Sequence, residues 1–154
     1  MKQIIKPDGE NQVIENDITI FLAGTIDDGN SINWQTETVD KIKCNNCTIF
    51  NPRNDNWNPK ASIDDVIKQI DWEQDYLLRS DIILFNFLSK SLSPITLLEL
   101  GQVLSHSGIE IFVCCPISYF RFTNVRHMCR RSNIPFFERF DDMIESLNER
   151  LEDL

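Results

Sequence analysis

Short apolar runs and amphipathic segments alternate along this chain, and this alternation most constrains how it can fold. Five apolar runs have the length and composition of buried strands, at residues 18–23, 48–50, 81–88, 110–115 and 135–137. Segments with helical spacing separate or follow them, at residues 31–42, 62–79, 93–107, 122–131 and 143–154. This pattern predicts one α/β domain over residues 1–154, with a doubly wound parallel sheet of about five strands. Residues 1–16 are predicted to form an N-terminal extension.

Local signals predict where two of these helices begin and which face another one buries. Ser31 is predicted to cap the first helix. Ser93 and Pro94 are predicted to open the third, because serine caps helices and proline suits the first helical position. The third helix is expected to end near Gly108. The second helix has a predicted buried face made of Val66, Ile67, Ile70, Leu77 and Leu78.

Composition and charge narrow the possible partners. Fifteen Lys and Arg residues against 24 Asp and Glu give a formal net charge of −9, which argues against nucleic acid or an anionic membrane as a partner. The longest apolar run, residues 82–88, is too short to span a bilayer. The N-terminal residues lack the apolar stretch of a secretory signal, so a cytoplasmic location is expected.

The five cysteines are expected to be free thiols. Cys44 and Cys47 form a lone CxxC pair with no second pair at zinc spacing, so no metal site is expected.

Glu99 is the most informative polar residue. In a doubly wound sheet, ligands bind beyond the carboxyl ends of the strands, which directs attention to loops 24–33, 51–62 and 86–94. Glu99 lies in a predicted helix that is apolar nearly all round. It either belongs to a solvated stripe with Gln102 and His106, or lies at the floor of a cleft. In the cleft, the helix N-terminus would help hold it ionised, as a nucleophile for an electrophilic carbon.

Asp71 and Asp75 are neighbours at i,i+4 spacing on the preceding helix. Like charges at this spacing repel, which can raise one pKa and make an acid available for proton transfer. The alternative is a pair of solvated acids beside Lys68 and Arg79.

Several loop residues are candidates for binding a ligand. Arg53 has the planar fork that binds phosphate or carboxylate, although a structural role is the commoner outcome. Trp34 and Trp57 are candidates for stacking on a base or for packing in the core. The loop before the third helix contains three serines, Ser89, Ser91 and Ser93. They either form an anion site at the helix N-terminus or are only part of a polar loop.

Over about residues 18–115, the chain resembles the nucleoside 2-deoxyribosyltransferase-like proteins. The segments that carry the resemblance are Phe21-Leu22-Ala23-Gly24 with Asn33-Trp34, Asn51-Pro52-Arg53, Trp72-Glu73 with Ser80-Asp81-Ile82-Ile83-Leu84-Phe85, and Ser93-Pro94-Ile95-Thr96-Leu97-Leu98-Glu99-Leu100-Gly101. The last is the most specific, because this family keeps its nucleophile in such an apolar-Glu-apolar-Gly helix. The resemblance implies a flavodoxin-like fold, no metal or other cofactor, and cleavage of the N-glycosidic bond of a (2′-deoxy)nucleoside.

The resemblance also implies roles for individual residues. Glu99 would attack C1′ and form a glycosyl-enzyme, and Asp75, with Asp71, would orient or protonate the departing base. The deoxyribosyl group would then pass to a second nucleobase. Gly24 would let the backbone approach the substrate, under a loop running from Thr25 to Asn33. The binding residues expected on this basis are Gly24, Thr25, Asn33, Trp34, Arg53, Trp57 and Ser93.

The expected partners are a small nucleoside or nucleotide, a free nucleobase and further copies of the chain as a homo-oligomer. Ser93 stands where classical transferases carry a further acid. Three alternatives remain: a hydrolase of nucleoside 5′-monophosphates that uses Arg53 and the loop serines, a NAD glycosidase, and an inactive nucleotide-binding module.

Overall fold

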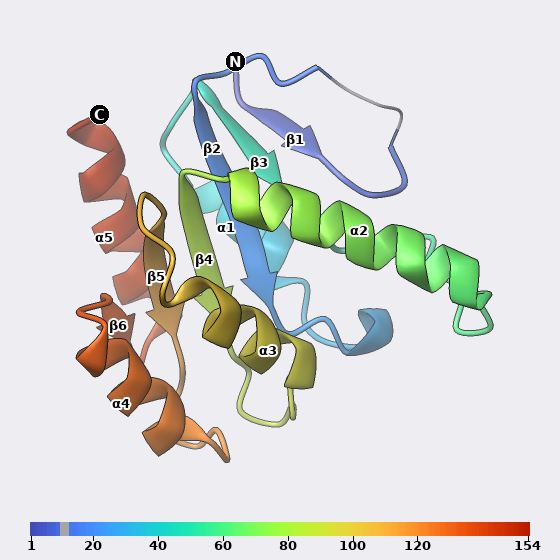
Figure 1. Ribbon diagram of the computed structural model, residues 1–154. Helices are drawn as coiled ribbons and strands as arrows, with labels where there is room; N and C mark the ends of the chain where they lie inside the picture. The colour runs from blue at the N-terminus through green and yellow to red at the C-terminus, as the bar shows by residue number, and fades with distance from the viewer. Residues whose placement is uncertain (10–12) are drawn as a thin grey trace.

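The computed structural model describes residues 1–9 and 13–154 and shows a parallel sheet of six strands flanked by helices (Figure 1). The strands are β1 (Gln3–Ile5), β2 (Ile18–Gly24), β3 (Cys47–Phe50), β4 (Ile82–Asn86), β5 (Glu110–Cys114) and β6 (Phe136–Phe137). The helices are α1 (Trp34–Lys41), α2 (Ile63–Arg79), α3 (Pro94–Val103), α4 (Phe122–Arg131) and α5 (Phe140–Glu152), with a 3-10 turn at Asp27–Gly29. The predicted fold class is confirmed.

The strand order is β1-β3-β2-β4-β5-β6, and each neighbouring pair is parallel. From β2 the chain goes to β3 on one side and then returns to β4 on the other, so the order reverses between β2 and β4. Side chains of β2 alternate between the faces, which places Phe21 in one core and Leu22 in the other. The first core packs under α2, α3 and α4, and the second packs under α1 and α5.

The sixth strand, β1, lies within the residues that were expected to be an extension outside the sheet. Gln3, Ile4 and Ile5 pair with Thr48, Ile49 and Phe50 of β3 and form the sheet edge. Two adjacent isoleucines are too short an apolar run to predict a strand, and backbone pairing with β3 supplies the stabilisation that the local sequence lacks.

Two predicted helix ends differ from the structure. Helix α1 begins after Asn33, whose side chain accepts from Thr36 N at 3.2 Å, because the predicted cap Ser31 instead donates to Ile26 O at 2.9 Å. Helix α3 ends at Val103, although its pattern suggested continuation to about residue 107.

The predicted buried face of α2 is largely wrong. Leu77 is buried, but the other four residues of that face are 37–49% exposed: Val66, Ile67, Ile70 and Leu78. The N-terminal part of α2 extends past the strands in Figure 1, so no sheet surface lies beneath it. The residues of α2 that do pack toward the core include Trp72 and Tyr76.

In the described part of the chain, no helix has the length and apolarity needed to cross a bilayer. Within the same residues, no group of three or more His, Cys, Asp or Glu side chains could hold a metal ion. The cysteine thiols are free, and burial raises the pKa of Cys47 to about 12.

Candidate active site

A cavity of about 320 Å³ lies at the carboxyl end of β2, the strand next to which the strand order reverses. Its wall is built from the end of β2 and the loop that follows, from the loop before α2, and from one face of α2. The start of α3 forms the remaining side. All three loops that the sequence singled out therefore contribute to one site.

Glu99 lines this cavity from α3 and is only 7% exposed. Its Oε2 atom is buried and has no hydrogen-bond partner among the described residues. Burial, and secondarily the negative charge of Glu73, raises the pKa of Glu99 to about 8. The expectation that the helix N-terminus holds this carboxyl ionised is therefore wrong, because Glu99 lies beyond the first turn of α3, where the helix dipole has faded.

Glu73 is the second carboxyl group in the cavity, and it comes from α2. Gln69, one turn earlier, donates from Nε2 to Glu73 Oε1 at 2.7 Å and to Pro52 O at 3.1 Å. Burial raises the pKa of Glu73, and the hydrogen bond from Gln69 opposes that shift. The 2.7 Å bond from Gln102 Nε2 to Gln74 Oε1 joins α3 to α2 and fixes the two carboxyl-bearing helices together.

The predicted acids Asp71 and Asp75 lie on the same helix but are exposed and do not line the cavity. Gln69 and Glu73 share the i,i+4 spacing that drew attention to the aspartates, and they face inward. The signal that could have found Glu73 is its position between Trp72 and Tyr76, both of which pack against the core.

A chain of hydroxyl groups forms the floor of the cavity below α3. Thr25 Oγ1 lies 2.5 Å from Ser93 Oγ, and Ser93 Oγ donates to Ser91 Oγ at 2.9 Å. Ser91 Oγ in turn donates to Asp27 at 2.6 Å. Ser93 occupies the N-cap position of α3 but makes no side-chain cap, because its hydroxyl is used in this chain. The two predicted binding residues Thr25 and Ser93 are thus brought together in the cavity wall.

Gly24 is required by the packing of the protein itself. A Cβ atom at this position would lie 2.4 Å from Asn86 O and 2.7 Å from Trp34 Cζ2. Trp34 is buried, and its Nε1 donates to Thr25 O at 2.8 Å. This tryptophan positions the loop after β2 and does not line the cavity.

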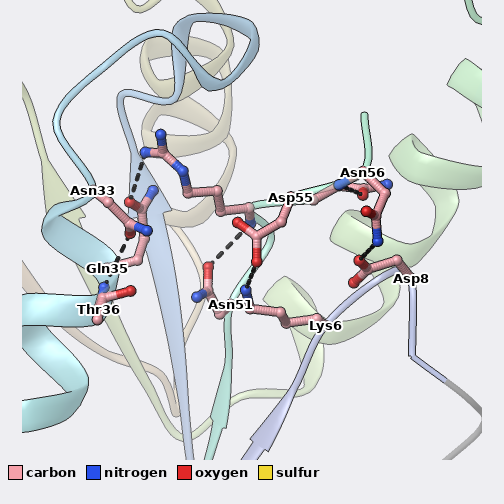
Figure 2. A network of polar contacts seen from close by, with 10 residues as sticks. Lys6, Asp8, Asn33, Gln35, Thr36, Asn51, Asp55 and Asn56 are labelled. Atoms are coloured by element: carbon pink, nitrogen blue, oxygen red, sulfur yellow. Dashed lines mark hydrogen bonds and ion pairs between the residues drawn. The ribbon is translucent and has the colours of Figure 1, made fainter. Parts of the chain in front are cut away.

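Arg53 is buried and holds the loop between β2 and α1. Its Nη2 atom donates to Gly29 O at 2.8 Å and to Ser31 O at 2.9 Å, and its Nη1 atom lies 3.4 Å from Gln35 Oε1. Figure 2 shows this Gln35, with Asn51, which accepts from Arg53 N at 3.0 Å. The guanidinium is therefore committed to the loop and is not among the cavity-lining residues.

The remaining two predicted binding residues differ in their placement. Trp57 is half-buried and lines the cavity together with an adjoining one of about 310 Å³. Asn33 is exposed at the start of α1, where it caps the helix, and it does not line either cavity.

Comparison with known proteins places this site in a family. A family model described as nucleoside 2-deoxyribosyltransferase like matches residues 17–119, which include every segment that lines the cavity. The fold resembles that of a conserved protein from Enterococcus faecalis V583 in a crystal structure, with a TM-score of 0.62 and 12% identity over 86% of this chain and 98% of that chain. No curated protein matches the chain significantly. Because the family model covers more than half of its residues, the chain belongs to the nucleoside 2-deoxyribosyltransferase-like family.

Proposed function

We propose that this protein cleaves the N-glycosidic bond of a 2′-deoxynucleoside through a covalent bond to Glu99 and transfers the deoxyribosyl group to another nucleobase. The family is associated with transfer or hydrolysis at the glycosidic bond of nucleosides. The observation that carries the finer proposal is the buried, unpartnered Oε2 atom of Glu99 in the wall of the cavity. A buried carboxyl oxygen without a partner is costly, and a ligand atom is the partner that the cavity can supply.

In the proposed reaction, ionised Glu99 attacks C1′ on the face opposite the base. The new bond joins a Glu99 oxygen to C1′, and the electron pair of the breaking C1′–N bond goes to the base nitrogen. An acceptor base then attacks C1′ and releases Glu99, so two inversions give net retention, as in retaining glycosidases. Water in place of the acceptor would give hydrolysis.

Glu73 is proposed to supply the proton that a neutral leaving base needs, the role predicted for Asp75. Its raised pKa favours the protonated form, and it shares the cavity with Glu99. After transfer, the proton lost by the acceptor base returns to Glu73. The two carboxyl groups disfavour simultaneous ionisation, which leaves one acid and one nucleophile in the same site.

Base exchange tests this proposal directly. Purified protein is incubated with a deoxynucleoside and a second free base, and products are separated by chromatography. Glu99→Ala is expected to abolish exchange, whereas Glu145→Gln, an exposed acid on α5, is expected to retain it. Glu73→Gln and Asp75→Asn compare the two candidate proton donors, and the larger loss of exchange activity is expected for Glu73→Gln. Unchanged exchange in Glu99→Ala would overturn the assignment of the nucleophile.

A further inference from the structure

All ionisable side chains that line the cavity, among the described residues, are acids. Four carboxyl groups line it, those of Asp27, Asp28, Glu73 and Glu99. No lysine, arginine or histidine occurs among the lining residues that the structure describes. Arg53 lies behind the loop, but its guanidinium donates to carbonyl oxygens of that loop. A ligand in this cavity therefore meets negative charge and no free positive side chain.

Two of these acids, Asp27 and Asp28, are exposed in the loop after β2. Both have left-handed backbones, with φ of 50° and 53°, a conformation that aspartate adopts more readily than most residues other than glycine. The Ser91 hydroxyl fixes Asp27 by its 2.6 Å bond. These exposed acids thus join half-buried Glu73 and buried Glu99 in the lining of the same cavity.

A second observation also points to a ligand, namely the carboxyl oxygen of Glu99 that has no hydrogen-bond partner among the described residues. Glu99 lines the cavity, and its buried Oε2 atom has no donor in the described part of the chain. Protein carboxylates that are permanently ionised and buried normally have a donor or cation beside them. Here the fold leaves that position open to whatever fills the cavity.

We propose that the cavity selects nucleosides by charge, so that a nucleoside with a positively charged base binds most tightly and a 5′-phosphorylated one most weakly. This inference rests on the proposed function and deepens it by naming the substrate class. Attraction between a cationic ring and the carboxylates favours the first ligand, and repulsion of a phosphate dianion disfavours the second.

The chemistry of bond cleavage agrees with this order. When the base carries a positive charge on its glycosidic nitrogen, the electron pair of the breaking C1′–N bond neutralises it, so the base leaves without a proton. Glu73 is then free to stay ionised beside the cation. The cation also favours ionisation of Glu99, the form that attacks C1′. Binding of such a ligand near neutral pH should therefore release protons.

The test compares probes that differ in charge and little in shape. Nicotinamide riboside is cationic, nicotinic acid riboside carries a cancelling ring carboxylate, and nicotinamide mononucleotide adds a phosphate. Methylation at N7 of 2′-deoxyguanosine gives a second cation, to be compared with the unmodified nucleoside. Affinities are measured by stopped-flow quenching of tryptophan fluorescence before turnover, because Trp57 lines the cavity. An indicator dye reports protons released on binding.

The cationic probe of a pair is expected to bind about tenfold or more tightly than its neutral counterpart, with the mononucleotide weakest and proton release confined to the cations. The preference should shrink as salt rises, and also in Asp28→Asn and Glu73→Gln, whereas Glu145→Gln on α5 should keep it. Equal affinities within the pairs, tighter binding of the mononucleotide, or no binding by any probe would overturn the inference. If the protein releases the base but the affinities do not follow this order of probes, only this inference is contradicted. If the affinities follow the order but no base is released, only the proposed function is contradicted.

Discussion

At the residue scale, the protonation state of Glu99 decides when this site can react. Its pKa is raised to about 8, by burial first and by Glu73 second. The proposed reaction needs one proton on the pair, with Glu99 ionised and Glu73 protonated, and this proton is lost as pH rises above about 8. We therefore expect kcat/KM for a neutral deoxynucleoside to fall above about pH 8.

Glu73→Gln removes both the negative charge that contributes to this shift and the proposed proton donor. The falling limb should therefore disappear, and the residual, lower rate should rise with the ionisation of Glu99, at a pH below about 8. The measurement is a pH profile of initial exchange rates for both proteins. A falling limb at the same pH in both would contradict the coupling between the two carboxyl groups.

The same shift makes a prediction about stability. The folded protein holds the Glu99 proton up to about pH 8, whereas the unfolded chain loses it near the ordinary glutamate pKa of 4.5. The folded state binds more protons between these values, so the stability contributed by Glu99 falls as pH rises through this window. Glu99→Gln should therefore stabilise the protein relative to wild type more at pH 9 than at pH 4, by at most about 5 kcal/mol. Urea unfolding at the two pH values measures it, and a pH-independent difference would contradict it.

At the element scale, the loop after β2 is held from behind by two buried side chains. Arg53 donates to Gly29 O and Ser31 O, and Trp34 donates to Thr25 O. A lysine at position 53 is a point donor that cannot reproduce the planar fork, so one or more of these part-buried carbonyl groups would lose their partner. Each such loss costs about 1–3 kcal/mol.

Arg53→Lys is therefore expected to lower the free energy of unfolding by about 1–3 kcal/mol and to raise KM. KM should rise by a similar factor for a deoxynucleoside and for its 5′-monophosphate, because the side chain positions the loop. Steady-state kinetics with both substrates, alongside denaturant unfolding, checks this. A rise confined to the monophosphate would show that Arg53 binds phosphate after all.

The order and type of most elements could be predicted from the sequence, since each strand from β2 to β6 coincides with an apolar run bounded by turn residues. The orientation of α2 could not. Its exposed apolar residues, such as Ile67 and Ile70, suggested a buried face, and that face placed Asp71 and Asp75 at the cleft border. Only the packing of Trp72 and Tyr76 against the sheet turns Glu73 inward, and this packing is a tertiary property. The prediction that Glu99 lies in a cleft did not depend on that orientation, because its motif places it on α3, from which it lines the cavity.

At the scale of the whole molecule, α2 and α3 lie on the same side of the sheet (Figure 1), and both carry exposed apolar side chains. Those at least 37% exposed are Ile63, Val66, Ile67, Ile70 and Leu78 on α2, and Ile95 and Leu98 on α3. Exposed apolar patches of this kind commonly mark association surfaces. Ile95 also lines the cavity, so a second copy seated here would border the site. The homo-oligomer expected from the family resemblance is therefore predicted to form through this surface.

Leu98→Glu should reduce the mass measured by light scattering after size-exclusion chromatography to that of a single chain. Leu154→Glu, at a residue 60% exposed near the end of α5, should leave the mass unchanged. The first variant should also raise KM, because the lost neighbour borders the cavity through Ile95. A wild-type protein that runs as a single chain at all concentrations would contradict the prediction.

Intact-mass spectrometry of protein quenched in acid during turnover tests the central claim most directly. With a deoxynucleoside and no acceptor base, the wild type should gain the mass of one deoxyribosyl group, and peptide mapping should locate it on Glu99. The adduct should disappear when an acceptor base is added before quenching, and Glu99→Ala should never carry it. Rapid exchange by the wild type with the sugar on another residue, or undiminished exchange by Glu99→Ala, would contradict the account.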